Sequence, residues 1–186
     1  MGNFNLKIFN SLSGKVDNLE FYPGKTVNLY LCGPTVYDYI HVGNLRPVII
    51  FDIMHRLFLH LGLSVKYVQN ITDIDDKIIQ KAKEEKKTEK EITEQYTEAY
   101  LQELTNYNIL QLALVPKVTE YIKEIQFFIE DLLKKGLAYQ KEGNVLFRLI
   151  NQSRYGQLSK QKIENLLSNT RKIAKIEKES SHDFVL

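Results

Sequence analysis

A strand, a turn, a helix and a second strand follow one another within about forty residues, and this order restricts the fold more than any other feature. Residues 27–31 read as a strand that runs into the turn-forming Cys32-Gly33-Pro34. Apolar residues then recur at helical spacing, namely Val48, Phe51, Met54, Phe58 and Leu61. Residues 64–70 predict the second strand. Because parallel strands need a crossover connection of this kind, we expect a parallel α/β sheet.

The ends of the crossover helix are predicted from three residues. Asn44 is a good N-cap, since an Asn side chain accepts a hydrogen bond from the free N–H groups of a first helical turn. Pro47 would then lie early in the helix, where its missing N–H is tolerated. Gly62 is expected to end the helix.

Two further helical patterns follow. Residues from Asp76 onward turn helical, and the charged run 81–87 reads as a solvated helix face, with a contact to a tRNA backbone as the less favoured alternative. Thr88 and Glu91 match a capping box. Behind them lies an apolar stripe that we expect in the core, formed by Ile92, Tyr96, Ala99, Tyr100, Leu104 and Tyr107.

Beyond Pro116 the pattern predicts another helix with an apolar face between residues 121 and 133, ended by Gly136. Residues 137–140 and 145–149, joined by a turn at 141–144, predict a β-hairpin. The segment 161–178 is polar and weakly patterned, whereas residues 183–186 begin like a strand.

Composition excludes several classes of protein. The chain has 186 residues and a formal charge of +2, close to neutral for its size, which argues against a protein that coats nucleic acid. Cys32 is the only cysteine, so an intramolecular disulfide framework and a zinc finger built by this chain alone are excluded. No secretory signal is visible, and the most apolar stretch, 48–61, is too short and too charged to cross a bilayer. We therefore expect a soluble, cytoplasmic protein without a membrane partner.

The chemistry is expected in segment 32–44, between the first strand and the helix. Ligands of parallel α/β sheets bind at this position, because free N–H groups and the helix dipole attract anions there. Gly43 would let a phosphate or a base approach the backbone, and His41 and Asn44 would donate hydrogen bonds to it. Taken singly, each residue is better explained by structure: His41 as a capping or core histidine, Asn44 as an N-cap, Gly43 as a turn residue and Cys32 as a core residue. The coincidence of His41, Gly43 and Asn44 at one strand–helix junction nevertheless favours a phosphate site.

Three motifs in order carry a resemblance to a known family. They are Cys-Gly-Pro-Thr-Val-Tyr-Asp at 32–38, His-Val-Gly-Asn at 41–44 and Asn-Ile-Thr-Asp-Ile-Asp-Asp-Lys at 70–77. The second is similar to the His-Ile-Gly-His signature of class I aminoacyl-tRNA synthetases, with Asn44 in place of the final His. Together with residues 6–10 and 183–186, the three motifs resemble the cysteinyl-tRNA synthetase family along essentially the whole chain.

The resemblance implies an α/β fold that is the N-terminal portion of a synthetase. Residues 1–114 would be the first half of a class I Rossmann-like nucleotide-binding fold. Residues 115–186 would be a connective insertion with helices and a β-hairpin, followed by an incomplete return to the catalytic fold.

The resemblance also implies roles for six residues. His41, Gly43 and Asn44 would bind ATP with Mg²⁺, and His41 and Asn44 would stabilise the triphosphate in the transition state. Gly33 and Thr72 would line a pocket for the cysteine substrate. Cys32 would be one ligand of a zinc ion whose other ligands are expected beyond residue 186. Zinc prefers a thiolate to a hydroxyl, so it would separate cysteine from serine.

The implied activity is that of a cysteine–tRNA ligase, which activates cysteine as the adenylate and transfers it to tRNA. The protein is expected to be a monomer, and this chain is expected to be inactive alone. Two alternatives stay open. One is a ligase that joins cysteine to an amino sugar through the same adenylate, and the other is an inactive remnant or a tRNA-binding module.

Overall fold

The computed structural model describes residues 4–21, 24–149, 152–161 and 178–186. The chain divides into two compact units, one made of Met1–Asn5 with Glu20–Ile122 and the other of Leu6–Leu19 with Lys123–Leu186. Most of the weakly patterned segment 161–178 lies outside the described residues. None of the helices in the described ranges is long and apolar enough to span a membrane.

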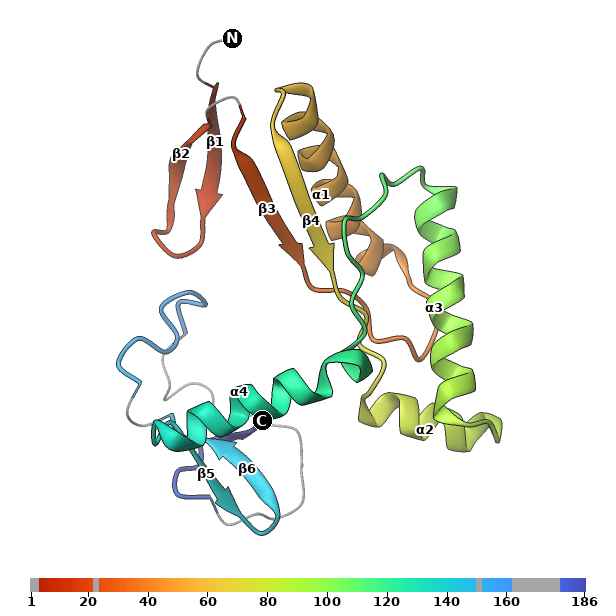
Figure 1. Cartoon of the computed structure of the whole chain (residues 1–186), viewed down its shortest axis with the longest axis vertical. Coiled ribbons are helices and arrows are strands. Elements are labelled where there is room, and N and C mark those ends of the chain that lie inside the picture. The colour runs from red at the N-terminus through yellow and green to blue at the C-terminus, as the bar shows by residue number, and fades with distance from the viewer. Residues whose placement is uncertain (1–3, 22–23, 150–151, 162–177) are drawn as a thin grey trace. The chain divides into compact units, whose positions relative to one another are not determined.

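The first unit is built on the predicted strand–helix–strand arrangement, which is confirmed. Strand β3 (Thr26–Leu31) and strand β4 (Ser64–Gln69) are parallel and in register from Thr26↔Ser64 to Leu31↔Gln69. Helix α1 (Val42–His60) connects them and packs against both, as Figure 1 shows. The carboxyl ends of both strands therefore lie at the same edge as the N-terminus of α1.

The predicted start of α1 is wrong by three residues. The N-cap is His41, not Asn44, and Asn44 is the third helical residue. The two side chains form a reciprocal capping box. The His41 side chain accepts a hydrogen bond from a backbone N–H of the first helical turn, and the Asn44 side chain accepts one from the backbone N–H of His41. Pro47 is consequently the sixth residue of the helix and has no N–H to donate to the carbonyl of Gly43. Gly62 ends the helix in the left-handed conformation, with φ of 75°, as predicted.

The core of this unit lies between α1, the two strands and helices α2 (Asp76–Glu85) and α3 (Glu89–Asn106). Each fully buried Leu, Ile or Val side chain there contributes about 1.5–3 kcal/mol. The buried apolar residues of the core are Leu31, Val36, Leu45, Val48, Tyr67, Ile71, Ile78, Ala82, Ile92, Tyr96, Tyr100 and Leu104.

Helix α3 confirms most of the predicted stripe. The capping box of Thr88 and Glu91 is present, and four stripe residues are buried, namely Ile92, Tyr96, Tyr100 and Leu104. Tyr107 is 54% exposed, against the prediction, because it is the C-cap and lies beyond the last helical residue.

After α3 the chain returns along β4. Backbone hydrogen bonds join Ala113 N to Tyr67 O, Gln69 N to Leu114 O and Ile71 N to Pro116 O. Isolated parallel bridges pair Val68 with Leu114 and Ile71 with Lys117. This segment satisfies the backbone groups on the edge of β4 that faces away from β3.

The second unit contains the predicted hairpin, β5 (Ala138–Lys141) and β6 (Asn144–Phe147), which is antiparallel. Its turn residues, Glu142 and Gly143, have φ of 50° and 76°, as a tight two-residue hairpin turn requires. The predicted final strand is confirmed as β7 (Phe184–Val185), which pairs with β6. Strands β1 (Phe4–Asn10) and β2 (Lys15–Phe21) form a two-stranded sheet of their own.

The predicted apolar face after Pro116 is only partly correct. A 3₁₀ turn, η1 (Val118–Tyr121), precedes helix α4 (Ile122–Lys134), and no residue of α4 is buried. Phe127 and Phe128 are exposed, whereas Ile129, Leu132 and Leu133 are partly covered. The helix exists as predicted, but only its C-terminal half packs within the described residues.

Candidate active site

The first and third motifs lie side by side at the carboxyl ends of β3 and β4. Thr72 N donates to Pro34 O at 3.0 Å, Val36 N donates to Thr72 O at 3.2 Å, and Thr35 bridges to Thr72 in parallel. The loop after β3 is thus an irregular extension of the parallel sheet. Both the backbone N–H and the backbone carbonyl of Thr72 are hydrogen-bonded to this loop.

Asn70 holds this junction together through its side-chain amide. Its Oδ1 accepts from Gly33 N at 3.0 Å and from the hydroxyl of Tyr30 at 2.9 Å, and its Nδ2 lies 3.2 Å from the hydroxyl of Thr72. A Cβ on Gly33 would lie 1.6 Å from the carbonyl oxygen of Asn70, so only glycine fits. Asn70 and Tyr30 were not singled out from the sequence, although Asn70 opens the third motif.

At the N-terminus of α1 two side chains add to the backbone bonds from Asn44 N and Leu45 N to His41 O. His41 Nδ1 accepts from Gly43 N at 3.0 Å, and Asn44 Oδ1 accepts from His41 N at 3.3 Å. Because Nδ1 accepts, a neutral His41 ring carries its proton on Nε2. The amide nitrogen of Asn44 has no hydrogen-bond partner among the described residues. Both side chains are exposed, so the ring Nε2 and the Asn44 amide are donors available to an anion.

A cavity of about 120 Å³ lies between the end of β3 and the first turns of α1. It brings together four of the six predicted site residues, Cys32, Gly33, Gly43 and Asn44. His41 and Thr72 are not among its lining residues; His41 lies at the helix cap and Thr72 in the neighbouring backbone junction. The remaining lining residues are Pro34, Pro47, Val48, Gln69 and Tyr100.

Gln69 and Tyr100 form a buried polar pair in the wall of this cavity. The Tyr100 hydroxyl donates to Gln69 Oε1 at 2.9 Å, and the two residues are only 2% and 1% exposed. Burial raises the pKa of Tyr100 well above its ordinary value of about 10, so the phenol stays neutral and remains a donor. Sequence reasoning assigned Tyr100 to the core and passed over Gln69, although a Gln at the inward end of a strand was a detectable signal.

Cys32 is exposed and unpaired, and its sulfur lies 3.9 Å from the carbonyl oxygen of Gly33. Within the described ranges, no group of three or more His, Cys, Asp or Glu side chains could hold a metal ion. Structural zinc sites have four ligands and catalytic sites three plus a substrate or water. The described residues therefore supply one thiol and do not complete a zinc site, and the role of Cys32 stays a prediction.

The charged run 81–87 makes contacts within the protein. Lys81 and Lys87 both lie beside Glu85, at 3.1 and 2.8 Å, and hydrogen bonds from Lys87 and Lys81 lower the pKa of Glu85 to about 2. Lys81 also lies 5.8 Å from the centre of the Tyr96 ring. These contacts explain Lys81, Glu85 and Lys87 as charged residues at the solvated end of α2.

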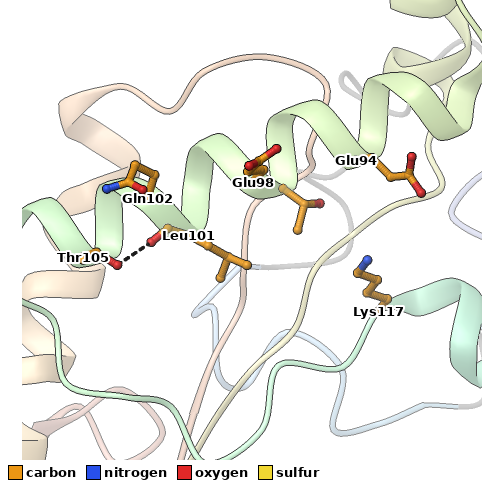
Figure 2. A pocket seen from close by; sticks show the side chains of 7 residues that line it. Glu94, Glu98, Leu101, Gln102, Thr105 and Lys117 are labelled. Atoms are coloured by element: carbon orange, nitrogen blue, oxygen red, sulfur yellow. Dashed lines mark hydrogen bonds between the residues drawn. The ribbon is translucent and has the colours of Figure 1, made fainter.

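A second hollow follows α3 and differs in character. Its volume is about 340 Å³, and Figure 2 shows that side chains of α3, including Glu94 and Glu98, line it together with Lys117. With two carboxylates and one lysine its lining has a net negative charge, which disfavours a phosphate. Of these two hollows, the cavity at the β3–α1 junction is therefore the better candidate for an anion site.

Comparison with known proteins decides the family. Residues 19–186 match the family model described as the class I (C) tRNA synthetase catalytic domain. The chain belongs to this family. The resemblance predicted from the three motifs is thereby confirmed, as is the class of fold.

Several curated proteins are similar in sequence to this chain. The cysteine–tRNA ligase of Finegoldia magna is 44% identical over 182 residues, which are 97% of this chain and 39% of the relative. Those of Lachnoclostridium phytofermentans and Malacoplasma penetrans are 43% and 39% identical, over 38% and 41% of their lengths. The chain thus spans about two fifths of the relatives that it matches.

Proposed function

We propose that this chain forms the amino-acid-activating part of a cysteine–tRNA ligase that takes part in protein biosynthesis. The observation that carries the proposal is the cavity of about 120 Å³ at the β3–α1 junction, where Cys32, Gly33, Gly43 and Asn44 meet. A cavity of this volume suits a small amino acid, and the donors at the start of α1 lie beside it. The names of the curated relatives support the same activity.

In the proposed reaction a carboxylate oxygen of cysteine bonds to the α-phosphorus of ATP, and the bond from that phosphorus to pyrophosphate breaks. His41 through Nε2 and Asn44 through its amide nitrogen would donate to phosphate oxygens as their negative charge increases. Preorganised donors of this kind typically contribute about 10²–10³-fold each to such a step. Gly43 would leave room for the nucleotide, with Mg²⁺ accompanying the phosphates.

Gly33 and Thr72 would act on the cysteine side of the site. Gly33 leaves the wall of the cavity without a side chain, and Thr72 would hold the strand end that faces it. The second step, attack of the terminal tRNA adenosine hydroxyl on the adenylate carbonyl with release of AMP, would need groups outside this chain.

Cys32 would contribute one thiolate to a zinc ion whose other ligands come from outside this chain. Its exposure leaves the sulfur available to a metal. Zinc content measured on the intact protein tests this role without reference to activity. We expect about one zinc per wild-type molecule and a clear loss in Cys32→Ser, whereas undiminished zinc in the variant would reject the assignment.

For the chain as a whole we propose residues 1–114 as the first half of the nucleotide-binding fold and 115–186 as the connective insertion. Residues 113–118, which follow α3, pair with β4 and Ile71, so the chain leaves the sheet a few residues after this proposed boundary. We further propose a monomeric, cytoplasmic protein.

Cysteine-dependent exchange of pyrophosphate with ATP tests the proposed activity. The intact protein is expected to exchange with cysteine and not with serine, and to charge tRNA. Exchange without tRNA charging would favour the amino-sugar ligase, and no exchange at all would favour the inactive remnant. Robust exchange by the 186-residue chain alone would contradict the expectation that the remaining part is required.

A further inference from the structure

We propose that Gln69, oriented by Tyr100, is a substrate-binding residue that donates a hydrogen bond from its amide nitrogen to the carboxylate of the amino acid. The inference rests on the proposed activation of cysteine at the same site. It assigns one contact within the cavity that none of the three sequence motifs indicates.

The first step of the argument is the position of Gln69. It is the last residue of β4, it lines the cavity and it is only 1% exposed. Its side chain passes close beneath the loop, because a Cβ on Gly33 would lie 3.3 Å from Gln69 Cγ. A larger residue than glycine at 33 would press on this side chain.

The second step is the orientation of the amide. Tyr100 donates its hydroxyl to Gln69 Oε1 at 2.9 Å, which assigns the oxygen to that bond and leaves Nε2 for another partner. Nε2 has no hydrogen-bond partner among the described residues. It is also absent from the fully buried side-chain atoms that lack a partner, so this nitrogen is accessible. The amide N–H₂ group is therefore the donor that this wall offers to the cavity.

The third step is the chemistry of the ligand. A zwitterionic amino acid has an ammonium group that only donates, and its strong acceptors are the two carboxylate oxygens. A donor in the cavity wall therefore selects the carboxylate. In the proposed reaction one carboxylate oxygen attacks ATP, so Gln69 would hold the other oxygen and present the first to the donors at the start of α1.

The test compares cysteine with cysteamine, which has the same thiol and amine but no carboxylate. In the intact protein, Gln69→Met keeps the length of the side chain and removes the donor. We expect the KM for cysteine in pyrophosphate exchange to rise by about 10- to 100-fold, the loss of one hydrogen bond to a charged group. The inhibition constant of cysteamine and the KM for ATP should stay within about twofold, since neither ligand uses this bond.

Two further variants separate binding from structure. Tyr100→Phe removes only the orienting hydroxyl and should raise the KM for cysteine by about 3- to 10-fold, and combining it with Gln69→Met should add nothing. Thr97→Val is the matched control, because Thr97 lies one turn away on α3 and its buried hydroxyl has no hydrogen-bond partner among the described residues. That variant should leave all three constants unchanged.

Three results would overturn the inference. Equal weakening of cysteine and cysteamine would make Gln69 a structural residue, and an unchanged KM for cysteine would show that the amide contacts no substrate. Wild-type protein without any cysteine-dependent exchange would remove the proposed function itself, which the first two results would leave standing.

Discussion

Gly33 lies at the start of the loop between β3 and α1, and Gly43 lies in the first turn of α1. The surroundings of these two glycines differ. At Gly33 an added Cβ would meet the backbone carbonyl of Asn70 at 1.6 Å. At Gly43 it would meet the imidazole of His41, with Cε1 at 2.7 Å and Nδ1 at 2.9 Å. Backbone in a sheet cannot move aside, whereas an exposed ring can rotate.

The two ends of this loop are therefore held in different ways. The Gly33 end is fixed by main-chain hydrogen bonds and by the amide of Asn70, so it sets the shape of the cavity. At the Gly43 end the side chains of His41 and Asn44 add two exposed hydrogen bonds to the backbone bonds of the helix, and they can exchange these bonds for contacts with a ligand. In the proposed reaction one end of this loop would set the shape of the cavity and the other would stabilise charge.

The largest expected effect comes from Gly33→Ala. Because the new Cβ overlaps backbone, we expect a loss of more than about 3 kcal/mol in the free energy of unfolding, measured by urea denaturation. Gly43→Ala is the matched control and should change stability by no more than about 1 kcal/mol, since alanine is the better helix former and offsets a weakened cap. Similar losses in the two variants would break the comparison.

The next largest effect concerns activity. His41→Ala and Asn44→Ala each remove one proposed phosphate donor, and each should lower kcat for cysteine-dependent exchange by about 10²–10³-fold. Stability should fall by only about 0.5–2 kcal/mol, the usual cost of a lost cap. A variant that loses stability in proportion to activity would mean that the cap is structural and not a phosphate site.

A smaller effect is expected from the buried side of α1. His55 is 7% exposed and lies against Tyr67, with Asp52 and Arg56 on the same helix. Burial lowers the pKa of His55 below its ordinary value of about 6.5, a shift that Asp52 opposes and Arg56 reinforces. The unfolded chain therefore binds this proton more tightly than the folded chain does.

The sign of the pH dependence follows. The contribution of His55 to stability is fully present above about pH 6.5 and is lost as the pH falls below it. His55→Phe, which keeps an aromatic ring beside Tyr67, should flatten the decline in unfolding free energy between pH 7 and pH 5. An unchanged slope would show that other groups cause the acid sensitivity.

Sequence reasoning succeeded where the signal is local. The strand–helix–strand unit, the Thr88–Glu91 capping box and the hairpin with its Glu142-Gly143 turn all depend on residues a few positions apart. The start of α1 was misplaced because His41 and Asn44 are both able to cap. Only the geometry shows that the imidazole is the cap and the amide its reciprocal partner.

The motif residues that line the cavity could be predicted from the sequence, whereas the buried pair in its wall could not. The motifs placed Cys32, Gly33, Gly43 and Asn44 at one strand–helix junction, and these four residues do line a common cavity. The pairing of Gln69 with Tyr100 spans 31 positions and depends on how α3 packs, which no local pattern reveals. For the same reason the exposure of the α4 face could not be predicted from its apolar spacing.

The most direct test of the central claim, that the β3–α1 junction activates cysteine, is a crystal structure of the intact protein with a non-hydrolysable cysteinyl-adenylate analogue. We predict that the cysteinyl group occupies the cavity beside Cys32 and Gln69, and that the phosphate mimic contacts His41 and Asn44. An analogue bound elsewhere, with the His41–Asn44 capping box and the cavity unchanged, would contradict the account.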